Sequence, residues 1–256
     1  MRIALFSDIH GNSVALDAVL TNIEAKGGVD AYWILGDFVA VGPDPIGVME
    51  RLLGLPSAVF TRGNTDRYVV TGERPAPTPG QVRNDPDLLE LYQEVTNCFA
   101  WTQGALAVSG YLEWLAALPL EYRFTLPDGT KFLGVHASPG YDDSDGVRPA
   151  STESDLRNLM QGCAADLVCV GHTHSARDVT VDDVRIVNLG SVSNPHPPDL
   201  RASYVVLETD SSGYKLAHHS VDYDHAAVIA ECERVKHPST GFITRYMLGQ
   251  HKPPWV

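Results

Sequence analysis

The fold is decided by residues 166–174, DLVCVGHTH. The apolar run that ends at Val170 predicts a buried β-strand. Because residues i and i+2 of an extended chain point to the same side, we expect His172 and His174 to meet at the carboxyl end of that strand. Neutral imidazole is the commonest protein metal ligand. The stretch therefore predicts part of a metal site, and the remaining ligands must come from elsewhere in the chain.

Polar side chains follow four other strand-like runs at the same relative position. Asp8 and His10 follow the run 2–6, and Asp37 follows the run 31–35. Asn64 and Asp66 follow the run 57–61, and His136 follows the run 131–135. The first three runs alternate with helical segments, a pattern typical of a parallel sheet that collects ligands at the carboxyl ends of its strands. We therefore expect these residues to converge with His172 and His174.

The remaining segments give a mixed α/β chain. We expect a helix after Asn12 or Ser13 that ends at Gly27-Gly28, and a second after Asp44-Pro45. Further helices are predicted at 87–103, 109–118, 151–161 and 224–235, and further strands at 122–126, 178–181, 185–189, 202–208 and 215–220. The turn at 127–129 predicts a hairpin, hence some antiparallel pairing. We interpret residues 1–256 as one domain with a helical insertion at about 67–118, and the tail at 251–255 as irregular.

Composition restricts the classes of function. The chain has 256 residues, of which 44% are hydrophobic and 20% charged, and its formal net charge is −13. This charge argues against general nucleic-acid binding, which needs basic surface. The N-terminus does not have the pattern of a signal peptide, and we expect no membrane span. Four cysteines without a CxxC pair favour a reducing cytoplasm over a disulfide framework. The oligomeric state is left open.

The five polar blocks, in this order, resemble those of the calcineurin-like metallophosphoesterases. Further blocks are similar to the small bacterial and archaeal branch often labelled YfcE-like phosphodiesterases: residues 42–45 (GPDP), 114–119 (WLAALP), and 190–192 (GSV) ahead of 199–204 (DLRASY). The resemblance runs from residue 3 to about residue 210. It implies an α/β fold of two packed mixed β-sheets flanked by helices, a four-layer sandwich.

The family also implies ligand roles. Asp8, His10, Asp37 and His174 would bind a first metal ion, and Asp37, Asn64, His136 and His172 a second, with Asp37 shared by both. Two divalent cations and two carboxylates leave a charge of about +2, which would hold a phosphoryl group on an acidic protein. Nitrogen and oxygen ligands without thiolate suit manganese, iron, zinc, nickel or cobalt. The cofactor expected is thus a pair of divalent ions of undetermined identity.

The implied reaction is two-metal hydrolysis of a small-molecule phosphoester, most simply a phosphodiester, by a metal-bound hydroxide. Asn64 and His136 could also hydrogen-bond substrate oxygens, and activity should fall below about pH 6.5 as imidazole protonates. Many family members carry histidine, held to protonate the leaving group, where this chain has Thr65. A threonine hydroxyl is too weak an acid for that role. We therefore expect aryl leaving groups to be favoured, with His196 as an alternative donor or an exposed loop residue.

Several alternatives stay open. Asp66 could orient a ligand, cap a helix or lie at the surface, and Arg201 could hold phosphate or form a salt bridge. His218, His219, His225, His237 and His251, together with Trp101 and Trp114, are interpreted as packing or surface residues. The substrate could also be a phosphomonoester, a nucleotide or a dinucleoside polyphosphate. A different class is a non-catalytic binding scaffold of the same fold, as in the retromer subunit.

Overall fold

A computed structural model describes residues 1–250 and places ten strands in two five-stranded sheets. The first sheet has the order β10-β9-β1-β2-β3, with bounds Gly213–Val221, Ala202–Asp210, Arg2–Phe6, Ala31–Leu35 and Ala58–Thr61. The second has the order β4-β5-β6-β8-β7, with bounds Glu121–Thr125, Lys131–Val135, Leu167–Val170, Val184–Asn188 and Arg177–Val181. Both sheets are mixed: β1, β2 and β3 are parallel, as are β5, β6 and β8, and the other pairs are antiparallel. The tail predicted to be irregular lies outside the described residues.

The layers follow from the alternation of side chains along buried strands. In β1, Ile3 and Leu5 belong to the core between the two sheets, whereas Ala4 and Phe6 belong to the core beneath the helices. Trp33 of β2 and Phe132 of β5 meet in the inter-sheet core, with ring centroids 4.5 Å apart. Both faces of these strands are therefore buried, and the order of layers is helices, sheet, sheet, helix, as expected.

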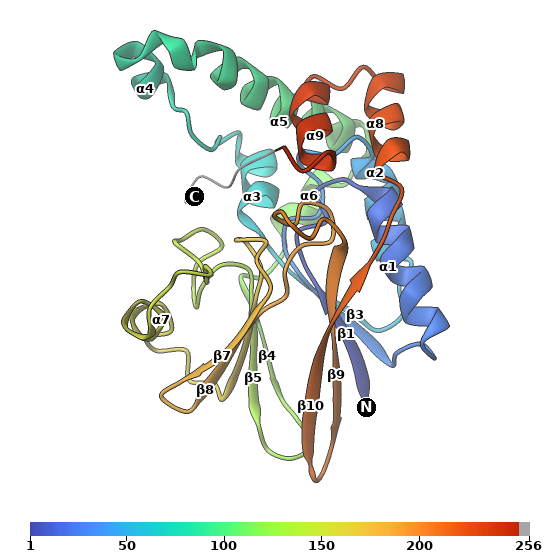
Figure 1. Cartoon of the computed structure of the whole chain (residues 1–256), viewed down its shortest axis with the longest axis vertical. Coiled ribbons are helices and arrows are strands. Elements are labelled where there is room, and N and C mark those ends of the chain that lie inside the picture. The colour runs from blue at the N-terminus through green and yellow to red at the C-terminus, as the bar shows by residue number, and fades with distance from the viewer. Residues whose placement is uncertain (251–256) are drawn as a thin grey trace.

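Helices cover the two outer faces. On the first sheet lie α1 (Ser13–Ala25), α2 (Pro45–Leu53), α3 (Asn64–Thr71), α5 (Leu89–Ser109) and α6 (Leu112–Ala116). On the second sheet lies α7 (Glu153–Leu159), whose Leu156 packs with Val168 and Ile186. Figure 1 shows α1 and α7 on opposite sides of the two sheets. No helix within residues 1–250 combines the length and the apolar composition needed to cross a bilayer.

Three helices were missed and one boundary was misplaced. The helices missed are α3, α4 (Pro79–Asn84) and α9 (Thr240–Met247), which packs on α8 (His225–Arg234). The helices predicted at 87–103 and 109–118 are α5, which continues to Ser109, and the short α6. Gly110 ends α5 with a left-handed φ of 80°, a glycine stop that marks the true boundary.

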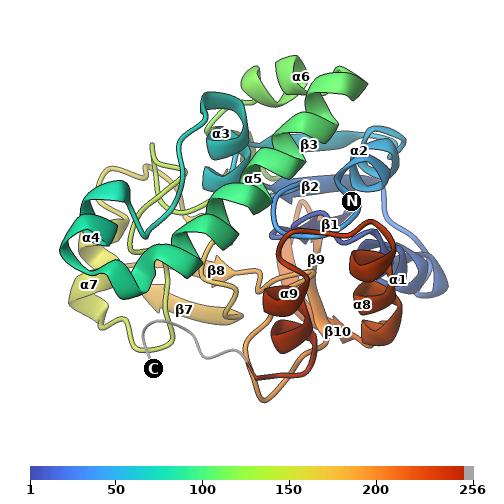
Figure 2. The same ribbon diagram turned by 90° about the horizontal axis from the view of Figure 1, so that it is seen from above.

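The carboxyl ends of the parallel strands all open toward one end of the molecule. Figure 1 places the N-terminus at the bottom, so β1 runs upward and its polar loop lies below α3 and α9. Figure 2, seen from above, shows α5 crossing this end beside the α8–α9 pair. The loops that follow these strands therefore lie at the end of the molecule where α3, α5, α8 and α9 are grouped.

Candidate metal centre

The seven predicted ligand residues come together from both sheets. Five of them have a left-handed backbone: Asp8 (φ 57°), His10 (φ 49°), Asp37 (φ 57°), His172 (φ 69°) and His174 (φ 57°). Positive φ is uncommon for residues other than glycine and concentrates at functional sites. The expectation that His172 and His174 share one side of an extended strand is therefore wrong. Strand β6 ends at Val170, and both histidines lie in the loop that follows it. The His172 ring faces Asn64, whereas the His174 ring faces His10.

Two glycines allow the loops to approach one another. A Cβ atom at Gly63 would lie 2.1 Å from Asp37 Oδ1, and one at Gly171 would lie 2.4 Å from Asp8 Oδ2. These distances are far inside van der Waals contact, so only glycine fits at either position. The backbone N–H of His172 donates to Asp8 Oδ2 at 3.1 Å and ties the loop of β6 to the loop of β1.

The first group of ligand atoms surrounds Asp8, which is fully buried. Its Oδ1 lies 3.1 Å from His174 Nε2 and 3.8 Å from His10 Nε2, and the two Nε2 atoms are 3.1 Å apart. One ligand atom from each of Asp8, His10 and His174 lies within 4.8 Å of the others. This spacing is compatible with one bound ion.

The second group surrounds Asp37 and Asn64. Asp37 Oδ2 lies 3.4 Å from His136 Nε2 and 3.7 Å from His10 Nε2, so this carboxylate stands between the two groups. Asn64 Oδ1 lies 3.1 Å from His136 Nε2 and 3.0 Å from His172 Nδ1. Asp8, Asp37 and His136 also offer ligand atoms within 4.8 Å of one another.

Each of the four imidazoles has one inner nitrogen, which faces the other predicted ligands, and one outer nitrogen, which is hydrogen-bonded to a backbone carbonyl. His10, His136 and His174 donate from Nδ1 to Ala40, Leu35 and Asn194 at 3.2, 2.8 and 2.9 Å, and His172 donates from Nε2 to Ser144 at 2.9 Å. A carbonyl only accepts, so each outer nitrogen carries the hydrogen. In the neutral form, each inner nitrogen then aims a lone pair at another nitrogen or at a carboxylate or amide oxygen. Lone pairs that converge in a buried space need protons or cations between them, and this donor set fits a metal centre.

Protonation of the site depends on both burial and the carboxylates. Burial lowers the pKa of His10 to about 4 and also lowers that of His172. Burial acts in the same direction on His136, but the adjacent Asp37 carboxylate overcomes it and raises the pKa to about 10. Burial would raise the pKa of Asp37, yet His136 holds it below its usual range. Asp37 is therefore a carboxylate at neutral pH, as a metal ligand must be.

Asp66 connects two of the ligand loops. Its Oδ2 accepts from the backbone N–H of Asp37 at 2.8 Å and of Gly63 at 2.9 Å, and its Oδ1 accepts from Phe38 N–H at 2.9 Å. Burial and the charge of Asp37 raise the pKa of Asp66 to about 7, against the effect of these N–H groups. Two of the roles left open for Asp66 are therefore present: the bond from Gly63 N–H caps the start of α3, and the bonds from Asp37 and Phe38 orient the loop of a predicted ligand.

Thr65, His196 and Arg201 lie at the edge of this centre. The Thr65 backbone N–H donates to Asp37 Oδ1 at 2.9 Å, while its buried hydroxyl has no hydrogen-bond partner within residues 1–250. The ring of His196 stacks on His174 with centroids 5.8 Å apart, beside a cavity of about 290 Å³. Arg201 lines the same cavity and pairs with Asp199 at 2.7 Å, which agrees with a structural salt bridge.

Other residues beside the centre were not predicted from the sequence. Tyr68 is buried, lies one helical turn after Asn64 in α3 and donates its hydroxyl to Asp143. Asp142 is buried between Arg62 and Arg67, at 2.8 and 3.1 Å. The i, i+4 spacing of Asn64 and Tyr68 was the available signal, but it requires a helix that begins at Asn64.

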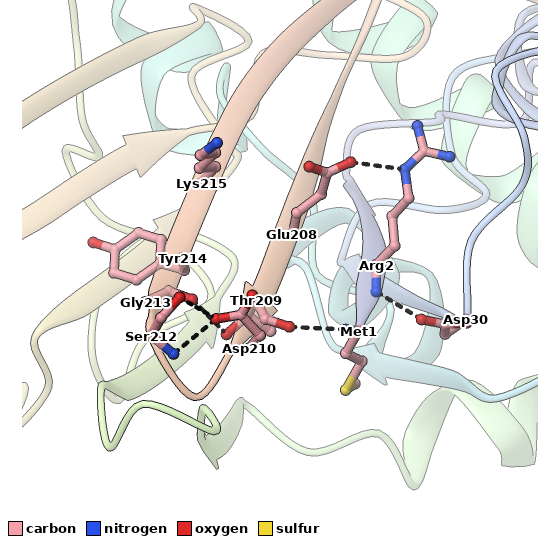
Figure 3. Close-up of a pocket in the computed structure, with 10 residues that line it drawn as sticks. All are labelled: Met1, Arg2, Asp30, Glu208, Thr209, Asp210, Ser212, Gly213, Tyr214 and Lys215. Atoms are coloured by element: carbon pink, nitrogen blue, oxygen red, sulfur yellow. Dashed lines mark hydrogen bonds and ion pairs between the residues drawn. The ribbon is translucent and has the colours of Figure 1, made fainter.

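A second cavity, of about 510 Å³, lies at the amino end of β1, far from these residues (Figure 3). Two of the charged side chains that line it have partners: Glu208 lies 3.2 Å from Arg2 Nε, and Asp30 accepts the backbone N–H of Arg2 at 2.7 Å. The N-terminal amine donates to the Thr209 carbonyl at 2.8 Å. This cavity offers no cluster of ligand atoms comparable to that at the other end of β1.

The sequence profile of the calcineurin-like phosphoesterase superfamily domain matches residues 1–212. The chain belongs to this superfamily. The match ends before α8 and α9, so these two helices lie outside the part that the profile describes. As a calcineurin-like phosphoesterase, the chain is a hydrolase of phosphoric esters, and its family is metal-dependent.

Relatives of this phosphoesterase agree with the family and the fold. An uncharacterized protein of Methanocaldococcus jannaschii is 27% identical over 237 residues, which cover 87% of this chain and 88% of the relative. A symmetrical bis(5'-nucleosyl)-tetraphosphatase of Klebsiella pneumoniae is 28% identical over 66% of this chain but only 50% of its own length.

Solved structures show the same fold along the whole chain. A hypothetical protein of Pyrococcus horikoshii OT3 has a TM-score of 0.80 and 22% identity, and covers 98% of this chain and 99% of its own. A metallophosphoesterase of Sphaerobacter thermophilus has a TM-score of 0.74 and 24% identity, with the same coverage of both chains. The prediction of a calcineurin-like metallophosphoesterase with two packed sheets is confirmed.

Proposed function

We propose that this phosphoesterase is a phosphodiesterase with a dinuclear metal centre. The observation that carries the proposal is the set of four imidazoles whose inner nitrogens face two buried carboxylates and one amide oxygen. Asp8, His10 and His174 would hold one ion, Asn64, His136 and His172 the other, and Asp37, which lies between the two groups, would serve both. The nitrogen and oxygen donors suit manganese, iron, zinc, nickel or cobalt.

The bound ions would supply two effects, a lowered pKa of water and positive charge for the phosphoryl oxygens. The chain itself supplies orientation. The backbone carbonyls of Ala40, Leu35 and Asn194 fix the tautomers of three histidines, and Asp66 fixes the spacing of the Asp37 and Asn64 loops. These contacts hold the ligand atoms in place before a substrate arrives, which reduces the reorganisation needed in the transition state.

Thr65 would be a poor proton donor to the leaving group. The Thr65 hydroxyl is a weak acid and is buried. His196 stacks on His174 at the rim of the centre, and we propose it as a residue that contacts the substrate and can donate a proton. If His196 does not serve as the donor, aryl phosphodiesters, whose leaving groups need little protonation, should be cleaved faster than alkyl phosphodiesters.

A second candidate is hydrolysis of dinucleoside polyphosphates. It is favoured by the similarity to bis(5'-nucleosyl)-tetraphosphatases, which this chain matches over half or less of their length in the relatives of Klebsiella pneumoniae and Pectobacterium carotovorum. A phosphomonoesterase or nucleotide hydrolase activity is a third candidate. All three activities would use the same metal centre, and they would differ in the residues that line the substrate pocket around it.

The test is metal analysis of the purified protein combined with a panel of substrates. We expect two equivalents of divalent metal per chain and turnover of bis(p-nitrophenyl) phosphate above that of p-nitrophenyl phosphate and diadenosine tetraphosphate. Asp37→Asn is the control for the centre. One equivalent of metal, or a higher rate on diadenosine tetraphosphate, would contradict the proposal, and the second result would favour the dinucleoside alternative.

We also propose that the chain forms one domain in which residues 67–118 are an insertion. Tyr68, Phe99, Leu106 and Leu115 of this segment belong to the same core as Phe38. Because they share that core, the segment should unfold together with the first sheet. Limited proteolysis that released residues 67–118 while leaving the remainder folded would contradict this interpretation.

A further inference from the structure

The loop after β8 connects two proposed ligands of the first ion. Its Asn194 carbonyl accepts from His174 Nδ1 at 2.9 Å. Its Ser191 hydroxyl donates to the Asp8 carbonyl at 2.9 Å, and the Ser193 backbone N–H donates to the same carbonyl at 3.1 Å. Asp8 and Ser191 are fully buried. One loop therefore holds both the backbone of Asp8 and the ring of His174.

A single peptide group in this loop is fixed at both of its ends. The Asn194 N–H donates to Ser191 Oγ at 2.8 Å, and the Ser193 carbonyl accepts from the Tyr223 hydroxyl at 2.7 Å. Because a peptide group is planar, these two bonds fix its plane. Asn194 precedes Pro195, and a residue before proline is restricted to extended conformations. The direction of the Asn194 carbonyl is therefore largely determined by the peptide group that Tyr223 and Ser191 hold.

The Asn194 carbonyl in turn determines which His174 nitrogen faces the centre. A carbonyl only accepts, so it keeps a hydrogen on His174 Nδ1, and Nε2 is then the nitrogen that can bind a cation once it is deprotonated. That Nε2 atom lies 3.1 Å from Asp8 Oδ1 and 3.1 Å from His10 Nε2. A carbonyl that turned away would permit the other tautomer or a rotated ring, and either change would remove this ligand atom from the centre.

Tyr223 belongs to the part of the chain beyond residue 212, where the match to the family profile ends. It lies between β10 and α8, and Figure 1 shows the chain rising from β10 into α8. Its side chain packs against both the core of the first sheet and the core between α8 and α9. The His225 ring lies 4.3 Å from the Tyr223 ring, and its Nδ1 is hydrogen-bonded to the Met247 carbonyl at 3.0 Å. The C-terminal helices therefore hold Tyr223 in place.

We propose that Tyr223 is a positioning residue for the first ion: by fixing the Ser193 carbonyl, it sets the Asn194 carbonyl that orients His174. The inference rests on the proposed role of His174 as a ligand of that ion. It gives the C-terminal part of the chain, which lies outside the profile of the superfamily, a function at the centre.

The test is Tyr223→Phe, which keeps the ring and removes the hydroxyl. Calorimetric titration of the metal-free protein with Mn²⁺ should show the affinity for one ion lowered about 10-fold and the affinity for the other little changed. The matched control is Tyr204→Phe, because the Tyr204 hydroxyl also donates to one neighbour, Asn22 at 2.8 Å, but in the contact between α1 and β9. This control should bind both ions as the wild type does. Unchanged affinities in Tyr223→Phe, or an equal loss in Tyr204→Phe, would overturn the inference.

Variants that lack one ligand identify the ion that is affected. Asn64→Ala removes a proposed ligand of the second ion, so adding Tyr223→Phe should still lower the affinity of the first site about 10-fold. His174→Ala removes the ring that Tyr223 is proposed to orient, so adding Tyr223→Phe should change the affinity less than about twofold. The same large loss in His174→Ala would mean that Tyr223 acts by another route, and the inference fails while the ligand set stands. If His174→Ala binds two ions as tightly as the wild type, the proposed ligand set itself fails.

Discussion

Replacing Asp66 with asparagine alters the contact that holds two ligand loops at a fixed spacing. In the wild type, Oδ2 accepts two backbone N–H groups, from Asp37 and Gly63, and Oδ1 accepts one, from Phe38. Asparagine has one oxygen, so its best orientation keeps the pair on Oδ2 and turns NH₂ toward the Phe38 N–H. One buried donor then lacks an acceptor, which costs about 1–3 kcal/mol.

The assays are urea unfolding of the metal-free protein and titration with Mn²⁺. Folding raises the pKa of Asp66 to about 7, so ionisation of this carboxyl group costs stability, by about 1.4 kcal/mol per pH unit between the unfolded and the folded pKa. Between pH 5 and pH 7 the wild type should therefore lose stability relative to Asp66→Asn, which carries no charge, whereas the missing acceptor in Asp66→Asn should weaken Mn²⁺ binding. The control is Asp30→Asn, because Asp30 also accepts a backbone N–H, from Arg2 at 2.7 Å, but at an exposed position away from the centre; it should match the wild type in both assays. Wild-type pH dependence and wild-type Mn²⁺ affinity in Asp66→Asn would refute the reasoning.

Four further results are expected. Asp37→Asn should lose measurable turnover and at least one equivalent of metal, because the carboxylate between the two groups is removed; retention of both would contradict the ligand assignment. Metal uptake should release protons, since the pKa of about 10 for His136 leaves its imidazole protonated at pH 7 in the metal-free protein; calorimetry in two buffers of different ionisation enthalpy measures the number. Thr65→His should raise the rate on alkyl phosphodiesters more than on aryl ones, as measured by the ratio of kcat/KM values. Burial lowers the pKa of His237 to about 4, so the unfolded chain binds the extra proton between pH 6.5 and 4, and this group lowers stability as the pH falls from 7 to 5; the change in unfolding free energy from pH 7 to pH 5 should therefore be less unfavourable in His237→Gln than in the wild type, by about 2 kcal/mol.

The strands that carry the centre were predictable because they are short, apolar and buried on both faces. Residues 2–6, 31–35 and 131–135 have the bounds expected from the sequence. Their ends place Asp8, Asp37 and His136 at one edge, which is why the site residues could be named without coordinates. The assignment of each residue to the first or the second ion came from the family resemblance, and this assignment stays a proposal.

The local conformation at the centre could not be predicted. The sequence of residues 171–174 carries no signal for a left-handed backbone at both histidines. We attribute this conformation to the tertiary contacts of the loop. One of them is the hydrogen bond from His172 N–H to Asp8, a residue 164 positions away. Similarly, Asn64 begins a helix after a glycine without a side-chain cap, so the usual start signal was missing and the place of Tyr68 was missed.

The proposed ligands are divided between the two sheets, and this division has a consequence for the maturation of the protein. The ribosome releases Asp8, His10, Asp37 and Asn64 long before His136, His172 and His174, and the first four alone lack most of the imidazoles. Strand β9, which pairs with the second edge of β1, is synthesised later still. If the proposed ions bind the folded chain, a cell short of metal would contain chains whose two sheets have packed together without the stabilisation that the ions would add, and these chains should be degraded first.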